Sequence, residues 1–150
     1  MNPFDLKTAL FAKHAQHVVL IHFPIALFIA GVLFDFLAQG AKRGALAAVA
    51  YYNLLGPAQT VIPVLATGLL AWQFQLEGQK LKGTLLLHLV LGWVSAALIW
   101  MVFYLKYRLR KKAIPDPSPT FRLALECVAV AVVALTAHLG GFLSGVNGAN

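Results

Sequence analysis

Four long apolar stretches, separated by short polar segments, dominate the pattern of the chain. They cover residues of about 16–38, 46–74, 84–106 and 121–143. A helix needs about 20 mostly apolar residues to cross the hydrocarbon core of a bilayer, and each stretch is long enough. The pattern therefore predicts an all-α integral membrane four-helix bundle, with residues 1–150 forming a single transmembrane domain.

Prolines modify two parts of this pattern. Gly56-Pro57 and Pro63 lie inside the second apolar stretch. Proline removes a backbone donor from a helix, so we expect the second helix to bend. A further proline series, at positions 115, 117 and 119, follows the basic run after Lys106. This segment is expected to form an extended linker before the last span.

Composition supports the membrane assignment. The chain is 60% hydrophobic and 11% charged, whereas soluble domains are about 45–50% apolar. A net charge of +7 can indicate nucleic-acid binding, but here the basic residues cluster in short segments between apolar stretches, as topology signals do. We therefore exclude nucleic acid as a partner and expect membrane lipid instead. Cys127 is the single cysteine, so the chain has neither an internal disulfide nor a c-type haem attachment motif.

The distribution of Lys and Arg predicts the orientation. Eight lie on one face of the predicted bundle and four on the other. The eight are Lys42, Arg43, Lys106, Arg108, Arg110, Lys111, Lys112 and Arg122, and the four are Lys7, Lys13, Lys80 and Lys82. The positive-inside rule places the richer face in the cytoplasm. We expect both termini on the outer, periplasmic side of a bacterial inner membrane, with the first span as its own insertion signal.

All five histidines fall toward the predicted outer face. His14 and His17 lie at the start of the first span, His22 a little deeper, His88 near the start of the third, and His138 near the end of the fourth. With a rise of 1.5 Å per residue, His22, His88 and His138 should lie within about one helical turn of a common depth. Ionisable groups in a span usually face the bundle interior or a functional pathway. A single interfacial histidine is equally well explained as a hydrogen-bonded residue.

Haem b is the first cofactor that this arrangement predicts. His22, His88 and His138 would be iron ligands, with His17 as a fourth candidate. Gly140 and Gly141 would let backbone approach the porphyrin, although glycines also serve ordinary helix packing. A quinone site is the second candidate, because it needs a histidine and aromatic walls. Zinc or copper is the third.

Two carboxylates lie near the predicted inner face. Asp35 is close to the end of the first span, and Glu126 is about one turn into the fourth. Arg122 precedes Glu126 by four residues, so an ion pair within the helix is the favoured interpretation. The alternative is a proton path from Asp35 and Glu126 toward the histidines.

The motifs resemble one known family. The stretch H17-V-V-L-I-H-F-P-I-A26 keeps both histidines and the F-P-I-A of the first-helix pattern H-P-x-x-V-H-F-P-I-A. T67-G-L-L-A-W72 is similar to a T-G-L-x-D-W stretch, with Ala71 replacing the acidic residue, while His88 and H138-L-G-G141 match two further motifs. The chain thus resembles the bacterial four-span proteins of domain-of-unknown-function family 2231. Some relatives carry fused Rieske-type or cytochrome c-type domains, so the resemblance implies membrane electron transfer.

Three functional hypotheses remain open from the sequence. The first is an electron-transfer subunit with a haem b or quinone site, acting in a larger membrane complex with periplasmic cytochrome c or iron–sulfur subunits and catalysing nothing alone. The second is a cofactor-free structural or anchor subunit of such a complex. The third is a transporter that uses the histidines with Asp35 and Glu126. It is the weakest, because the sequence shows no inverted repeat.

Overall fold

Four long helices make up the computed structural model. They are α2 (Ala15–Ala38), α3 (Gly44–Gln75), α4 (Gly83–Arg110) and α5 (Pro119–Leu143). The structure describes residues 15–39, 44–115 and 117–145. Each helix contains a stretch long and apolar enough to cross a membrane, so the predicted fold class is confirmed. The chain is a multi-pass, all-helical membrane protein.

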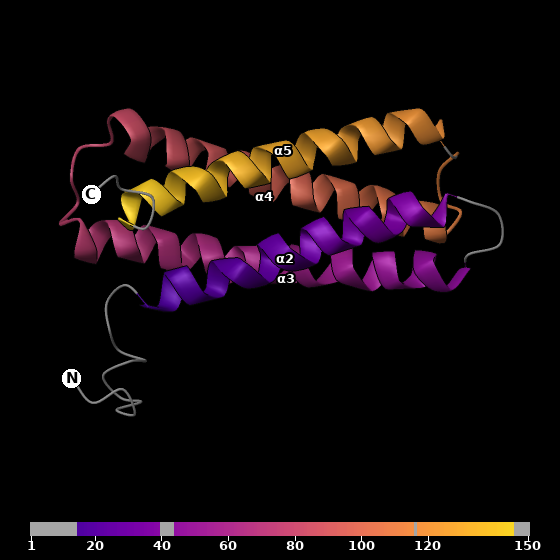
Figure 1. Ribbon diagram of the computed structural model, residues 1–150, viewed down its shortest axis with the longest axis horizontal. Helices are drawn as coiled ribbons and strands as arrows, with labels where there is room; N and C mark the ends of the chain where they lie inside the picture. The colour runs from indigo at the N-terminus through magenta and orange to yellow at the C-terminus, as the bar shows by residue number, and fades with distance from the viewer. Residues whose placement is uncertain (1–14, 40–43, 116, 146–150) are drawn as a thin grey trace, which may run out of the picture.

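Successive helices run in opposite directions and form two hairpins, α2–α3 and α4–α5 (Figure 1). The bundle closes because α3 also packs on α4, and α2 on α5. The beginnings of α2 and α4 and the ends of α3 and α5 lie together, and we call this the histidine end. The opposite end, which contains Ala38, Gly44, Arg110 and Pro119, is the basic end.

The core lies between the helices, and the outer surface of the bundle is apolar. Phe28, Leu54 and Ile99 are among the buried side chains that fill the interior. Phe23 and Phe74, by contrast, are 58% and 65% exposed. Large exposed apolar side chains are costly in water but favourable against lipid. The surface therefore fits a bilayer environment.

Two glycines let α2 and α3 approach closely. A Cβ added to Gly31 would lie 2.9 Å from the Leu54 side chain, and one added to Gly56 would lie 2.8 Å from Leu27. Small residues at such contacts are a common way for membrane helices to pack. α3 runs as one helix through Pro57 and Pro63. The predicted bend at these prolines stays a prediction.

The linker before α5 is shorter than predicted. α4 continues past Lys106 to Arg110, because long basic side chains can extend from the apolar span into water. α5 begins where Ser118 accepts a hydrogen bond from the backbone N–H of Phe121 (3.2 Å) and Pro119 occupies the first turn. Both are favoured features of a helix N-terminus.

Candidate functional site at the histidine end

His88 of α4 is partly buried against α5. Its Nδ1 lies 3.0 Å from the backbone carbonyl oxygen of Thr136. A carbonyl only accepts hydrogen bonds, so Nδ1 carries the proton and donates it. Nε2 of the neutral ring therefore holds a lone pair. The described residues provide no hydrogen bond to this atom.

His17 of α2 is also partly buried, and its Nδ1 is hydrogen-bonded to α3. Its Nδ1 lies 3.2 Å from the Thr67 hydroxyl oxygen. That hydroxyl donates its own proton to the Val64 carbonyl oxygen (3.0 Å), so it must accept from the imidazole. The neutral His17 ring is thereby also fixed with its proton on Nδ1 and a lone pair on Nε2. His17 and His88 lie close enough to interact electrostatically.

Each of these two imidazole rings packs against a glycine of the neighbouring helix. A Cβ added to Gly68 would lie 3.0 Å from Cε1 of His17, and a Cβ added to Gly140 would lie 3.0 Å from Cε1 of His88. A distance of 3.0 Å is tighter than ordinary packing, so glycine lets each ring rest closer to the neighbouring helix than a larger residue would. Gly140 lies against the His88 imidazole, and its approach to a porphyrin stays a prediction.

These matching contacts reveal an internal repeat. His17 and His88 are 71 residues apart, and Gly68 and Gly140 are 72 apart. The buried Phe28 and Ile99, like Asp35 and Lys106 at the basic end, are also related by 71 residues. Both hairpins run in the same direction. The repeat is therefore parallel, and differs from the inverted repeat considered from the sequence.

A second hydrogen-bonded link joins α4 and α5 beside His88. The Thr136 hydroxyl donates to the Val132 carbonyl oxygen (2.8 Å), so the buried Ser95 hydroxyl donates to Thr136 across 2.9 Å. Thr136 thus accepts a hydrogen bond from His88 at its carbonyl oxygen and one from Ser95 at its hydroxyl oxygen. Both bonds fix the rotation of α4 relative to α5.

The other histidines lie elsewhere. His22 was expected to face the bundle interior, but its side chain is exposed. Its Nδ1 lies 2.6 Å from the Val18 carbonyl oxygen of its own helix. His138 is also exposed and meets Phe142 edge-on, with ring centroids 4.9 Å apart. The Gly141 carbonyl accepts a bond from the Ser144 hydroxyl. His14 lies outside the described residues. That His22, His88 and His138 are haem ligands stays a prediction.

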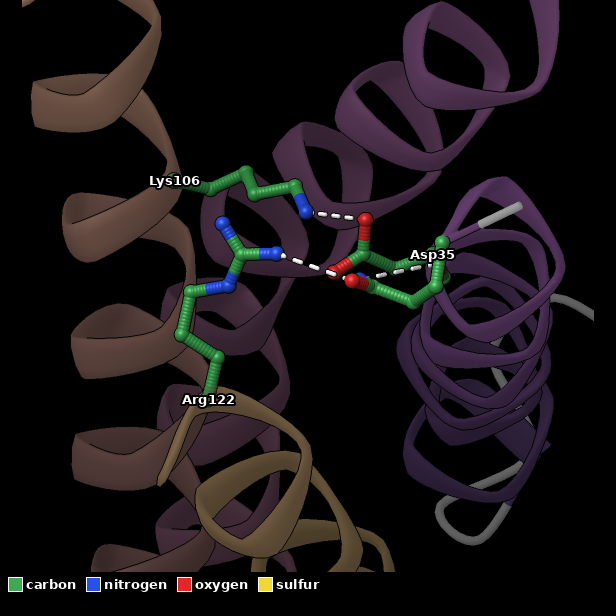
Figure 2. A network of polar contacts seen from close by, with 4 residues as sticks. Asp35, Lys106 and Arg122 are labelled. Carbon is green, nitrogen blue, oxygen red and sulfur yellow. Dashed lines mark hydrogen bonds and ion pairs between the residues drawn. The ribbon is translucent and has the colours of Figure 1, made fainter. Parts of the chain in front are cut away.

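Asp35 and Lys106 form an ion pair at the basic end. Figure 2 shows Lys106 of α4 and Arg122 of α5 reaching toward α2 around Asp35. Arg122 donates to the side-chain oxygen of Gln39 (3.3 Å), and Gln39 donates to the Asp35 carbonyl (3.3 Å). The network connects α2, α4 and α5. The sequence pattern does not predict the contact between Asp35 and Lys106.

Glu126 is buried beside this network. It is 4% exposed, Asp35 is 2% exposed, and the two carboxyl groups interact. Arg122 and Lys106 also interact electrostatically with Glu126. One oxygen of each carboxyl group, Oδ2 of Asp35 and Oε2 of Glu126, has no hydrogen bond within the described residues. The structure thus places the two carboxylates together, while the proton path stays a prediction.

A multi-ligand metal site is not evident. Across residues 15–39, 44–115 and 117–145, no three His, Cys, Asp or Glu side chains gather closely enough to hold a metal ion. Zinc sites generally need three or four protein ligands. A haem iron needs only two axial side chains, which a pair of imidazoles can supply.

The chain matches the model of one known protein family over nearly its whole length. The model of a family described as "Predicted membrane protein (DUF2231)" matches residues 13–149. The chain belongs to this family. The match covers both hairpins of the DUF2231 protein and all four histidines of the described region. No curated protein and no solved structure matches this DUF2231 chain.

Helical periodicity explains which histidine faces inward in this DUF2231 protein. His17, Pro24 and Gly31 follow one another at intervals of seven residues, which is close to two turns, and Pro24 and Gly31 are buried. His22 is two residues before Pro24 and so lies on the opposite side of α2. The same interval relates His88, Ser95 and Val102 on α4, where Ser95 and Val102 are buried. This spacing was the sequence signal for the inward pair.

Proposed function

We propose that this DUF2231 protein is an electron-transfer subunit of the bacterial inner membrane, with a redox site between His17 and His88. The proposal rests on one observation: both partly buried rings are held by Nδ1, which leaves the Nε2 lone pairs to bind. Ligating histidines commonly use one ring nitrogen for a carbonyl or carboxylate and the other for the metal. Thr67 and Thr136 supply the supporting contacts.

Haem b is the cofactor that this pair fits best. His17 and His88 would hold its iron through Nε2, from α2 and α4. Haem supplies one-electron transfer when bound. The protein's part is to fix both tautomers through Thr67 and Thr136 and to seat the rings on Gly68 and Gly140. The proposal replaces His22 and His138 as ligands, because both side chains are exposed.

A quinone is the second candidate, and the same tautomers favour it. A neutral imidazole with a lone pair on Nε2 can accept the hydroxyl proton of a quinol. Both rings lie within membrane-spanning helices and are only partly buried, which would admit a lipid-soluble ligand. In that case one histidine would act as proton acceptor while the quinol loses its electrons to a partner subunit.

Orientation and partners follow from charge. Arg108, Arg110, Lys111 and Lys112 gather where α4 ends, so we propose the basic end as cytoplasmic and the histidine end as periplasmic. A periplasmic cytochrome c or iron–sulfur subunit would then exchange electrons with the histidine end. The chain would act within a larger membrane complex, and a cofactor-free anchor role is the competing proposal.

A visible spectrum tests the proposal. The protein is purified in mild detergent from its native membrane, and a dithionite-reduced minus oxidised spectrum is recorded with a pyridine haemochrome assay. We expect a b-type signal that His17→Ala and His88→Ala each remove, while His22→Ala and His138→Ala retain it. Loss only in His22→Ala or His138→Ala would overturn the ligand assignment.

Quinone content separates the remaining possibilities. Extracted lipids of the purified protein are assayed for bound quinone by chromatography. A protein without haem that retains quinone, and loses it in His17→Ala and His88→Ala but not in His22→Ala, would establish the quinone site. Absence of both cofactors from a fully helical protein would favour the anchor role.

A further inference from the structure

A cavity opens at the basic end, away from the paired histidines. Its volume is about 330 Å³, and it lies between α3, α4 and α5. Gly44, Ala47, Ala48 and Tyr51 line it from α3, Lys106, Leu109 and Arg110 from α4, and Arg122 from α5. Three of the lining side chains carry a positive charge, and no lining side chain carries a negative one.

Arg110 is the cation of this cavity that no carboxylate neutralises within the described residues. Lys106 pairs with Asp35, and Arg122 interacts with Glu126. The Arg110 guanidinium instead lies over the ring of Tyr51, with its carbon 4.5 Å from the ring centroid. An aromatic ring positions a guanidinium without cancelling its charge. Arg110 therefore remains a binding group for an anion.

The first turns of α3 form the opposite wall. Gly44, Ala47 and Ala48 have small side chains, so they leave room beside the helix backbone. The beginning of a helix carries the positive end of its dipole. This wall thus adds to the positive potential that Arg110 and its neighbours create.

Aromatic side chains continue from the cavity along α4. Tyr51 packs on Phe103, with ring centroids 5.8 Å apart, and Phe103 contacts both Trp100 and Tyr107. Trp100 and Tyr107 are exposed on the outer surface. Cations above an exposed aromatic surface, at the end of membrane-spanning helices, match the headgroup and upper acyl chain of a phospholipid.

From this combination we infer that the cavity binds the phosphate headgroup of an anionic phospholipid from the surrounding bilayer. Arg110 provides the charge-assisted hydrogen bonds, and one acyl chain lies along Phe103 and Trp100. The site is independent of the histidine end. A free phosphate ion shares the headgroup chemistry but would make no use of the aromatic surface.

Native mass spectrometry of the full chain in detergent tests the inference. The probes are dioctanoyl-phosphatidylglycerol, dioctanoyl-phosphatidylcholine and inorganic phosphate. We expect the anionic lipid to bind more tightly than the zwitterionic one, and Arg110→Gln to weaken it about fivefold. Ala48→Leu, which fills the cavity without changing charge, should weaken it as well. Lys111→Gln is the matched control, because it removes the same charge from an exposed residue outside the cavity.

Each other outcome overturns the inference. Equal affinity for both lipids would remove the selectivity for a headgroup charge. Equal losses in Arg110→Gln and Lys111→Gln would mean diffuse attraction rather than a site. Binding of inorganic phosphate with the same dependence on Arg110, and no preference for the lipid, would assign the cavity to a soluble anion. Circular dichroism of every variant confirms that the helices are retained.

Discussion

Asp35 of α2 and Lys106 of α4 pair with each other from equivalent positions of the two hairpins. Each lies 18 residues after the inward histidine of its own helix, His17 or His88. The two helices that carry the inward histidines thus meet through an ion pair at one end of the bundle and bring their imidazoles near each other at the opposite end.

Lys106→Met should destabilise the bundle. It leaves the buried Asp35 carboxylate without its ion-pair partner and next to Glu126, and such a loss costs about 3 kcal/mol. The free energy of unfolding, measured in mixed detergent micelles, reports the cost. The double variant with Asp35→Asn should recover most of it, because no unpaired charge then remains at position 35. If the losses of unfolding free energy from the two substitutions simply add in the double variant, Asp35 and Lys106 do not form an ion pair.

Thr67→Val should release the tautomer of His17. The variant keeps the side-chain shape but removes the hydroxyl that accepts the Nδ1 proton. Nitrogen NMR of histidine labelled with ¹⁵N should then show His17 shifting from the Nδ1-protonated form to a mixture. Thr67→Ser, which keeps a hydroxyl, is the matched control and should preserve the wild-type signal. This experiment needs no bound cofactor. An unchanged tautomer in Thr67→Val would assign control of the tautomer to the Val64 backbone carbonyl, which also interacts with His17, rather than to Thr67.

Gly140→Ala should displace His88. The added Cβ would lie 3.0 Å from Cε1, and a ring that moves away lengthens its bond to Thr136. We expect a loss of about 1 kcal/mol in the free energy of unfolding and a shifted His88 ring signal in proton NMR. Gly92→Ala on α4 is the control, because its nearest side-chain atom, on Leu65, is 4.0 Å away. Alanine there should stabilise the helix slightly. Equal effects of both substitutions would show that the Gly140 contact with His88 is not what makes Gly140→Ala unfavourable.

Thr136→Val should cost about 1–2 kcal/mol of unfolding free energy, because it leaves the buried Ser95 hydroxyl without an acceptor. Thermal unfolding of the purified protein measures the change. Ser95→Ala in the same chain should reduce the cost, since both polar groups are then absent. If the loss of unfolding free energy in the double variant equals the sum of the two single losses, the two hydroxyls are not hydrogen-bond partners.

Single cysteines can test the orientation. In a Cys127→Ser background, Lys80→Cys should react with a membrane-impermeant maleimide added outside spheroplasts, because it lies in the loop at the histidine end. Lys112→Cys, beyond the end of α4, should react only after the membrane is permeabilised. The reverse pattern would place the histidine end in the cytoplasm.

The fold could be predicted from the sequence because hydropathy reports membrane spans directly. The four apolar stretches correspond to α2, α3, α4 and α5. The rotation of each helix was harder, because apolar residues cover all sides of a lipid-facing helix and mark no inward face. Depth alone therefore favoured His22, whereas the seven-residue spacing of His17, Pro24 and Gly31 marks the buried side.

Contacts between helices were also beyond the sequence pattern. Arg122 and Glu126 attract attention because they are four residues apart on one helix. Their charges influence each other, while the ion pair between them stays a prediction. Asp35 and Lys106 are far apart in the chain, and only the packing of α2 against its neighbours brings them together. The supporting roles of Thr67 and Thr136 likewise depend on which carbonyl or hydroxyl faces each ring.

The two hairpins also bear on the origin of the protein. A chain with two similar halves is what duplication and fusion of a gene for a two-span ancestor would produce. In a dimer of identical hairpins, the positions of Asp35 and Lys106 would hold the same residue, so no ion pair of opposite charges could form between them. Fusion removes that constraint, because each half can then change on its own. The ion pair therefore requires two halves that differ in sequence at these positions, whereas the inward histidines are identical in both halves.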